Sequence, residues 1–314
     1  MQKERAHLHG SRLLRIFARF CMSERMDTLD RMRRFGFFFL FLMAGWLVCQ
    51  PVQAQRSEIG FGVGGSFYMG DINPKRVFYK TQWAGSLFYR YNFDTRLALR
   101  AGVSYGRVMG ADADFGNIRN LNFRNDLWEV AALVEVNFLD FFTGSYQHRI
   151  SPYLVLGVGM VYSNPQGLFA DGTEGERWVD LRPLHTEGQG LEGYGLKQYS
   201  RLHCVVPMGL GLKVSVFPFM SVGVEWTMRL AFTDYLDDVG GTYADPVVLG
   251  EKYGQESAYF ADPSGHTHQV GSRRGDAGTY DWYSFAMFTV SFRLPGKDRL
   301  CPAYAGIGLK KKRR

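Results

Sequence analysis

The 314-residue sequence has few of the features that mark disulfide-bonded or helical proteins. Of its four cysteines, only Cys204 and Cys301 lie after residue 54, so the sequence indicates no disulfide framework. No segment carries the 3.6-residue apolar period of an amphipathic helix. The apolar run from Phe35 to Cys49 is shorter than the about 20 residues that a membrane-spanning helix needs. These absences argue against a disulfide scaffold, a helical bundle and a helical membrane protein.

The apolar run has the layout of a secretion signal instead. Arg33 and Arg34 precede it, and Val52-Gln53-Ala54 follows as a small-residue cleavage site. The pattern predicts an N-terminal extension plus signal peptide over residues 1–54, with the signal at about 32–54. Lipidation of Cys49 is the alternative, and Val48 disfavours it because a small residue usually precedes a lipidated cysteine.

The net charge of +7 is concentrated at the two ends of the chain. Residues 1–34 carry nine Lys/Arg and four Asp/Glu, and residues 295–314 carry seven and one. The remaining residues 35–294 therefore have a net charge of −4, which gives no reason to expect nucleic acid as a partner. We predict a folded body at 55–294 and a basic C-terminal tail at 295–314.

Apolar residues occupy every second position along much of the body. In segment 221–232, one face carries Trp226 and large aliphatic residues, and the other carries Glu225, Arg229 and small residues. Similar alternation predicts strands at 58–68, 83–93, 96–105, 127–138, 152–162, 205–216, 221–232 and 282–294. Small residues fit the crowded interior of a closed barrel, and large apolar residues fit lipid. The sequence therefore predicts an all-β fold, an eight-stranded antiparallel transmembrane β-barrel in the outer membrane.

The connections between these strands alternate in length. The long ones span 69–82, 107–125, 163–201 and 233–281, and the shorter ones span 92–96, 139–151 and 217–219. This alternation predicts long extracellular loops at one end of the barrel, with both termini at the periplasmic end.

The predicted inner faces carry charges of both signs in nearly equal number. They are Glu58, Arg90, Arg100, Glu129, Glu135, Lys213, Glu225, Arg229 and Arg293. The lumen of an eight-stranded barrel is filled by side chains, and an unpaired charge there costs several kcal/mol. We predict a structural charge network that plugs the lumen, rather than a water-filled pore.

Some motifs allow a cofactor or catalytic interpretation. Gly60, Gly62 and Gly65 formally match a dinucleotide fingerprint, but no helix or βαβ unit follows them. No Gly-x-Ser-x-Gly nucleophile motif is present, although His185 and His203 keep a lipid-modifying barrel enzyme open as a lesser alternative. We expect no catalysis and no cofactor.

Two further clusters suggest metal binding only weakly. His266 and His268 supply two of the three or four ligands that a metal site needs. Asp234, Asp237 and Asp238 do not follow the calcium-loop spacing. The simplest interpretation is a water-exposed strand end, and divalent bridging to lipopolysaccharide is the alternative. We expect no metal site.

Six segments, taken in order, resemble PorG-type outer-membrane barrels of the type IX secretion system. They are GGSFYMGDINP (64–74), FYRYNF (88–93), ADADFGN with RNLNFRNDLWEV (111–130), SPYLVLGVG (151–159), WVDLRPLHTEGQG (178–190) and FTDYLDDVGGTY (232–243). The resemblance spans about residues 58–294. It implies a non-catalytic protein that ties the periplasmic PorK–PorN ring to the outer membrane during protein secretion and gliding motility.

The resemblance directs attention to the periplasmic end of the predicted barrel. The connection 139–151 carries five partner-binding candidates: Phe141, Phe142, Tyr146, His148 and Arg149. Aromatic residues and arginine are enriched at the centre of protein interfaces. For Phe141 and Phe142, a place in the inner aromatic girdle is an equal alternative. Membrane lipid and lipopolysaccharide are the other expected partners, and a surface adhesin or structural protein is the second functional interpretation.

Overall fold

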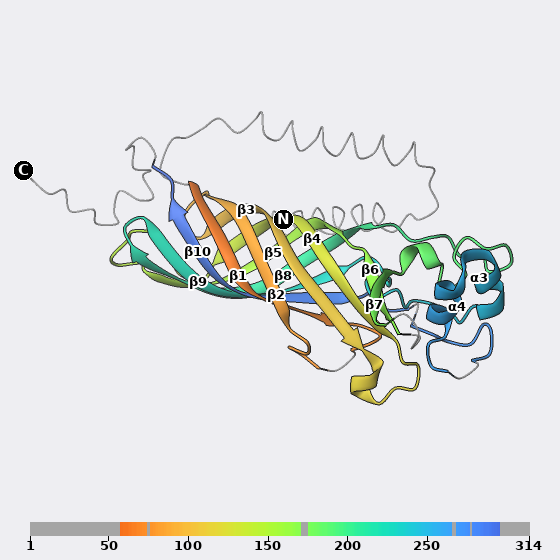
Figure 1. Cartoon of the computed structure of the whole chain (residues 1–314). Coiled ribbons are helices and arrows are strands. Elements are labelled where there is room, and N and C mark those ends of the chain that lie inside the picture. The colour runs from red at the N-terminus through yellow and green to blue at the C-terminus, as the bar shows by residue number, and fades with distance from the viewer. Residues whose placement is uncertain (1–56, 74–75, 171–174, 266–267, 277, 296–314) are drawn as a thin grey trace, which may run out of the picture. The chain divides into compact units, whose positions relative to one another are not determined.

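A computed structural model of the protein describes residues 57–73, 76–170, 175–265, 268–276 and 278–295. Eight of its strands form a closed antiparallel barrel (Figure 1). They are β1 (Ser57–Met69), β2 (Gln82–Asn92), β3 (Leu97–Ala111), β4 (Asn122–Asn137), β5 (Ile150–Tyr162), β8 (Leu202–Phe217), β9 (Met220–Ala231) and β10 (Trp282–Arg293). The pairing of β1 with β10, from Glu58 opposite Arg293 to Met69 opposite Trp282, closes the barrel. The predicted eight-stranded antiparallel barrel is confirmed.

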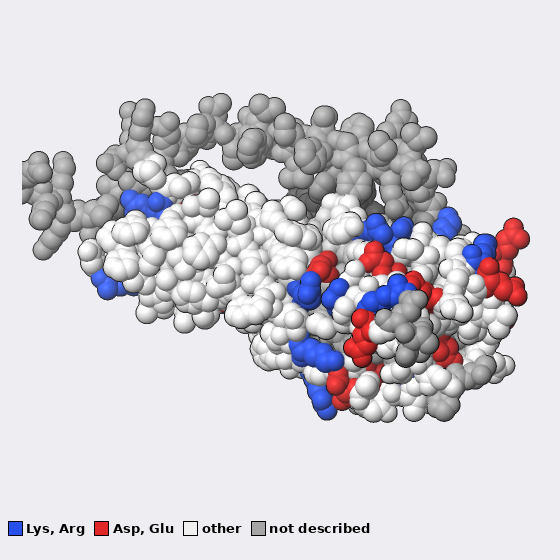
Figure 2. Space-filling view, viewed as in Figure 1, with Lys and Arg blue, Asp and Glu red and all other residues white. Residues whose placement is uncertain are grey.

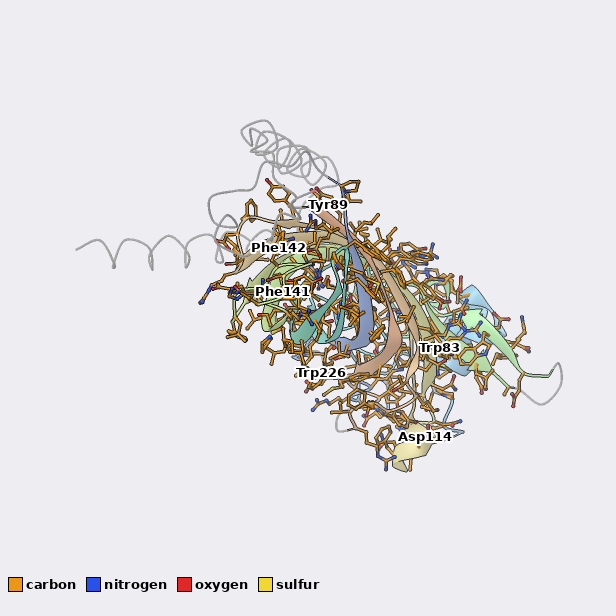
Figure 3. All side chains as sticks on the ribbon, turned by 90° about the vertical axis from the view of Figure 1, so that its left-hand side faces the viewer. Trp83, Tyr89, Asp114, Phe141, Phe142 and Trp226 are labelled. Carbon is orange, nitrogen blue, oxygen red and sulfur yellow. The ribbon has the colours of Figure 1, made fainter. Side chains whose placement is uncertain are left out.

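The outer wall of the barrel is apolar. The alternation of segment 221–232 is oriented as predicted, because Trp226 is 45% exposed and the neighbouring Glu225 only 8%. Other large exposed residues on the wall include Phe61, Val63, Leu87, Val103, Val130, Leu154, Leu210 and Val224. Exposed aromatics lie towards both strand ends, with Trp83, Trp128 and Tyr162 near the long connections and Phe93, Phe138, Phe217 and Phe219 near the short ones. Figure 2 shows an uncharged wall between two charged ends, and Figure 3 shows Trp83 and Trp226 outside the ring of strands. This wall suits hydrocarbon.

Glycines on the inner wall leave room for large rings that fill the lumen. A Cβ atom at Gly60 would lie 2.4 Å from Cζ of Phe88, and one at Gly211 would lie 2.3 Å from Cζ of Tyr153. Both distances are far below van der Waals contact, so neither position accepts a side chain without displacing a ring. The Gly60–Gly65 stretch thus belongs to strand β1 and has no phosphate-binding helix after it.

The described parts of the long connections form a folded cap, defined here as the described residues within 70–81, 112–121, 163–201 and 232–281. It contains η1 (Asp112–Phe115), β6 (Pro165–Phe169), β7 (Arg177–Asp180), η2 (Arg182–Leu184), α3 (Pro246–Tyr253) and α4 (Gln255–Ala261). Two apolar clusters lie within the cap, one around Phe169, Leu184 and Phe260, the other around Leu191, Leu249 and Ala261. A third joins cap residues such as Leu236 to the inner faces of the barrel strands. The long connections are present as predicted, and the structure adds two short helices that the sequence analysis did not predict.

The helices were missed because they are short. With eight residues in α3 and seven in α4, neither repeats an apolar period often enough to be recognised. The start of α3 does have a local signal, because the Asp245 side chain accepts a hydrogen bond from the Val247 amide and Pro246 follows it. Within the described ranges, no helix has the length and hydropathy to cross a membrane. The predicted signal segment and the basic tail from residue 296 onwards lie outside the described residues.

Candidate functional site

The lumen near the short connections is filled by charged side chains from four strands. Arg90 donates hydrogen bonds from Nη1 to Glu58 Oε2 (2.8 Å) and from Nε to Glu135 Oε2 (3.1 Å). Lys213 donates from Nζ to the other oxygen of Glu135. Glu58 also accepts a hydrogen bond from Thr143 Oγ1 (2.9 Å), in the connection between β4 and β5. All four charged side chains are almost fully buried, and each has an opposite charge within contact distance.

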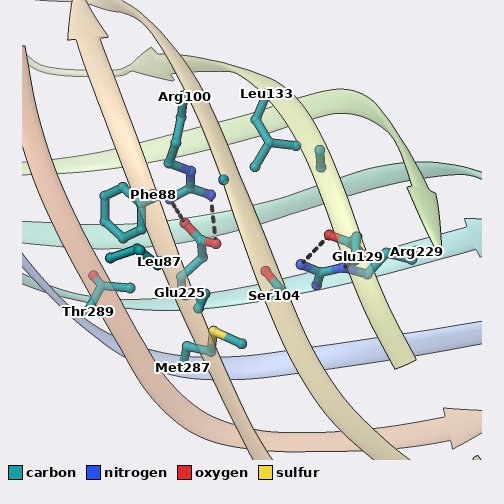
Figure 4. Close-up of a pocket in the computed structure, with 13 residues that line it drawn as sticks. Leu87, Phe88, Arg100, Ser104, Glu129, Leu133, Glu225, Arg229, Met287 and Thr289 are labelled. Carbon is teal, nitrogen blue, oxygen red and sulfur yellow. Dashed lines mark hydrogen bonds and ion pairs between the residues drawn. The ribbon is translucent and has the colours of Figure 1, made fainter. Parts of the chain in front are cut away.

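Two further ion pairs cross the lumen towards the cap. Arg100 donates from both Nη atoms to the carboxylate of Glu225 (2.6 and 2.8 Å), and Arg229 donates from Nε to Glu129 Oε2 (3.0 Å). Figure 4 shows both pairs on the wall of one small cavity. The cavity has a volume of about 30 Å³, which is room for water and not for a solute.

Tyrosine hydroxyls complete the hydrogen bonding of these two carboxylates. Tyr153 donates to Glu225 (2.8 Å) and Tyr283 donates to Glu129 (2.6 Å). Eight of the nine predicted lumen charges are thus brought together in pairs across the barrel. The ninth, Arg293, lies at the end of β10 and donates from Nη1 to the carbonyl of Thr143 (3.2 Å).

The connection between β4 and β5 folds back into the mouth of the barrel. Phe141 is 5% exposed and Phe142 9%, and Figure 3 looks onto this end. The ammonium of Lys213 lies 4.6 Å from the Phe141 ring centroid, and the guanidinium of Arg293 lies 5.2 Å from that of Phe142. The prediction of Phe141 and Phe142 as partner contacts needs correction, because both rings are buried. The girdle alternative fails for the same reason, since the rings cover the lumen charges.

The other three partner candidates remain at the surface of the same connection. Tyr146 is 71% exposed, and the guanidinium of the exposed Arg149 lies 4.8 Å from its ring centroid. His148 is half-buried and its carbonyl accepts a hydrogen bond from the Phe142 amide (3.5 Å). The exposed ring of Phe219 belongs to the turn between β8 and β9. An aromatic and basic surface therefore remains at this end.

At the opposite end, two of the three aspartates after β9 are buried, and Asp234 is half-buried. Asp237 and Asp238 are each 1% exposed, so the interpretation as a water-exposed strand end was wrong. The chain turns inwards after β9, and Asp237 Oδ2 accepts a hydrogen bond from Tyr68 Oη (2.7 Å) on β1. Asp238 accepts hydrogen bonds from Thr186 and Tyr199 (both 2.6 Å). Burial is the main cause that raises the pKa of Asp238, to about 6.

The buried pair of Glu187 and Arg274 joins distant parts of the cap. Arg274 Nη1 donates to Glu187 Oε1 (3.0 Å) and to the carbonyl of Asp238 (2.6 Å). The same Glu187 oxygen accepts hydrogen bonds from the amides of Gly240 and Gly241 (3.1 Å each). Segments 178–190 and 232–243 therefore meet here. Sequence reasoning missed this pair, because no pattern connects two residues 87 positions apart.

Among the described residues, His185, His203 and His268 have different partners. His185 stacks on the Tyr253 ring, His203 is buried on β8, and His268 pairs with Asp262 (2.8 Å). In the part of the chain that the structure describes, neither His185 nor His203 hydrogen-bonds to a serine hydroxyl. The same residues contain no group of three or more His, Cys, Asp or Glu side chains placed to hold a metal. His266 lies outside them.

Fold and lumen together define a small plugged β-barrel with an apolar outer wall. A family profile, a domain of unknown function (DUF6089), matches residues 34–177. No curated protein matches the chain.

Similar solved structures include Neisserial surface protein A, with 9% identity and a TM-score of 0.37 over 78% of this chain and all of that one. The attachment invasion locus protein Ail of Yersinia pestis has 11% identity and a TM-score of 0.35, over 76% of this chain and 98% of that one. The N-terminal barrel domain of Pseudomonas aeruginosa OprF has 9% identity and a TM-score of 0.30, over 76% of this chain and 97% of that one.

Proposed function

We propose that this protein is a non-catalytic outer-membrane barrel that anchors the periplasmic ring of the type IX secretion system. The observation that carries the proposal is the combination of an apolar outer wall with a lumen closed by buried ion pairs. Such a barrel inserts in a membrane but offers solutes no path. Its function then lies at its two ends, where chain meets water. The type IX assignment rests on the resemblance of the six segments to PorG-type barrels.

The periplasmic surface of this anchor consists of Tyr146, Arg149 and their neighbours. A stacked tyrosine–arginine pair offers a ring and a forked hydrogen-bond donor in one place, a combination typical of interface centres. The connection that presents it is held in the barrel mouth by the buried Phe141 and by the Thr143–Glu58 hydrogen bond. This support fixes the backbone, so little ordering is needed on binding.

The test is co-purification of the ring proteins PorK and PorN with the barrel from detergent-solubilised outer membranes. Replacing Tyr146 and Arg149 together by alanine is expected to abolish co-purification and secretion while barrel insertion is unchanged. The matched control replaces Tyr280 and Arg273 by alanine, an exposed aromatic and an exposed arginine in the cap. Normal co-purification and secretion with the first double variant would contradict the proposal.

A surface adhesin is the second candidate, and the folded cap favours it. Charged side chains gather over the cap in Figure 2, and helix α3 exposes Val247 and Val248. Deletion of residues 245–275 is then expected to remove cell attachment while secretion stays normal. Intact attachment after this deletion contradicts the adhesin and leaves the anchor.

A further inference from the structure

The outer wall of the β3–β4 hairpin changes from apolar to charged in regular steps towards the cap. Successive outward-facing pairs are Val103–Val130, Tyr105–Trp128, Arg107–Asp126 and Met109–Arg124. Each step advances two residues, about 7 Å along the strand. Aliphatic, aromatic and then ionic side chains follow one another as the bilayer passes from hydrocarbon to headgroups. The arginines thus lie just beyond the aromatic girdle.

The β6–β7 hairpin continues this face sideways from the barrel. Arg124 of β4 pairs with Gln166 of β6, and Leu168 of β6 pairs with Trp178 of β7. Directly paired residues of antiparallel strands share a face, so Trp178 and Arg124 lie on the same side of the sheet. Figure 3 shows the hairpin projecting beyond the ring of strands. A hairpin in this position overhangs the lipid that surrounds the barrel.

Arg124 is the positive charge on this face that lacks a carboxylate. Both Nε and Nη2 of Arg107 donate to Asp126 (2.7 and 2.9 Å), which also accepts from Tyr105 Oη (2.8 Å). Arg124 donates from Nε to the neutral Gln166 (2.8 Å), and its guanidinium lies 4.4 Å from the Trp178 ring centroid. Among the described residues, no carboxylate lies within ion-pair distance of Arg124. The surroundings of this cation therefore favour an added anion.

We propose that this face binds a phosphate group of the anionic glycolipid of the outer leaflet, with Arg124 as its main cation and Arg107 beside it. A guanidinium offers paired donors that match phosphate oxygens. Gln166 and the Trp178 ring already fix the position of the Arg124 guanidinium, so binding loses little side-chain freedom. The inference rests on the proposed membrane location and is independent of secretion.

The test measures binding of bisphosphorylated lipid A to the purified barrel in detergent, by native mass spectrometry. Arg124→Gln is expected to weaken binding about tenfold, the equivalent of one charge-assisted hydrogen bond. Removing the phosphates from the lipid A should weaken binding to the wild type at least as much. The matched control is Arg177→Gln, the same charge change on the same hairpin. Arg177 belongs to its other face, against Phe169 and Glu256, and this variant should bind like wild type.

The proposal is overturned if Arg124→Gln and Arg177→Gln lose lipid A binding equally, because the attraction is then unspecific. It is also overturned if the dephosphorylated lipid binds as well as the phosphorylated one. Displacement of the lipid by an equal concentration of inorganic phosphate also overturns it, in favour of a free-phosphate site. Resistance of the folded band to SDS checks that Arg124→Gln is folded. A wild-type barrel that fractionates with the outer membrane but binds no lipid A defeats this inference alone. A wild-type barrel absent from that membrane defeats the proposed function.

Discussion

Tyr68 and Asp237 share a hydrogen bond of 2.7 Å across 169 residues of sequence. The same hydroxyl lies 2.6 Å from Asp281 Oδ1. A hydroxyl has one proton to donate, so the second contact requires a protonated carboxyl group. The cluster joins the end of β1, the segment after β9 and the segment before β10, and it therefore holds the cap on the barrel.

This cluster predicts that the cap loosens as pH rises. Burial raises the pKa of Asp281 to about 7. When folding raises the pKa of a carboxyl group, the group stabilises the folded protein fully at a pH below its pKa in the unfolded chain, about 4. This stabilisation is lost as the pH rises through the pKa in the folded protein. The pKa of Asp238, raised to about 6, adds a loss in the same direction at lower pH. The negative charges of these aspartates are also repelled by neighbouring carboxylates, namely those of Asp71, Asp234 and Glu187. The positive charge of Arg274 offsets this repulsion at Asp238.

Hydrogen-exchange protection factors for residues 233–245 measure this effect, because they are corrected for the intrinsic pH dependence of exchange. They are expected to fall about tenfold or more between pH 5 and pH 8.5, since one pKa unit corresponds to tenfold. Asp281→Asn should reduce the fall in protection, because it removes one of the two titrating groups and leaves Asp238. A cap equally protected at both pH values would show that the carboxyls do not titrate in this range.

Removing one member of a lumen ion pair is expected to destabilise the barrel strongly. Glu225→Gln removes the carboxylate that Arg100 hydrogen-bonds and, among the described carboxylates, leaves this buried guanidinium only Glu135, whose Oε2 lies 3.9 Å from Nη1. Breaking a buried ion pair costs about 3 to 5 kcal/mol. Replacing both, with Arg100→Met and Glu225→Leu, should recover much of that loss. Urea unfolding in detergent micelles measures the difference. Arg96→Gln, which breaks the exposed pair with Asp140, is the control and should have no measurable effect.

The buried ring of Phe141 is expected to contribute stability in proportion to its burial. Phe141→Ala leaves a cavity over Lys213 and should cost about 3 to 5 kcal/mol in the free energy of unfolding. Phe219→Ala on the outer surface should cost less than about 1 kcal/mol. Similar losses in both variants would mean that Phe141 does not seal the barrel mouth.

Gly211 is expected to tolerate no side chain. The methyl group of Gly211→Ala collides with the Tyr153 ring, and moving that ring breaks its hydrogen bond to Glu225. A cost of about 1 to 3 kcal/mol follows from overpacking and the lost bond. Gly85→Ala is the matched control on β2, where the nearest atom, Gly62 O, is 3.7 Å from the added carbon. Thermal unfolding distinguishes the two variants when it is monitored by the loss of the compact SDS-resistant band.

The barrel could be predicted from the sequence because strand side chains alternate strictly between two faces. That rule placed Glu225 inside and Trp226 outside from their spacing alone. It also placed the lumen charges, although it did not specify which charges pair. Their partners depend on how far each strand is shifted against the next, and no local pattern records that shift.

The cap and the barrel mouth could not be predicted in the same way. Alternation ends at Asn137, so nothing in the sequence showed that Phe141 and Phe142 turn into the lumen. The aspartates after β9 look like a solvated strand end until Tyr68 and Tyr199 are placed beside them. Burial of a carboxyl group depends on donors supplied from distant parts of the chain.

The contact between β1 and β10 also makes the barrel indivisible. These strands form a seam, where Ser291 donates to Glu58 (2.9 Å) as well as completing the ladder of backbone bonds. A chain that stopped before residue 282 would expose two unpaired strand edges to hydrocarbon. No water is present there to hydrogen-bond their backbone N–H and C=O groups. The other seven strands would be intact in sequence and still unable to persist in a bilayer.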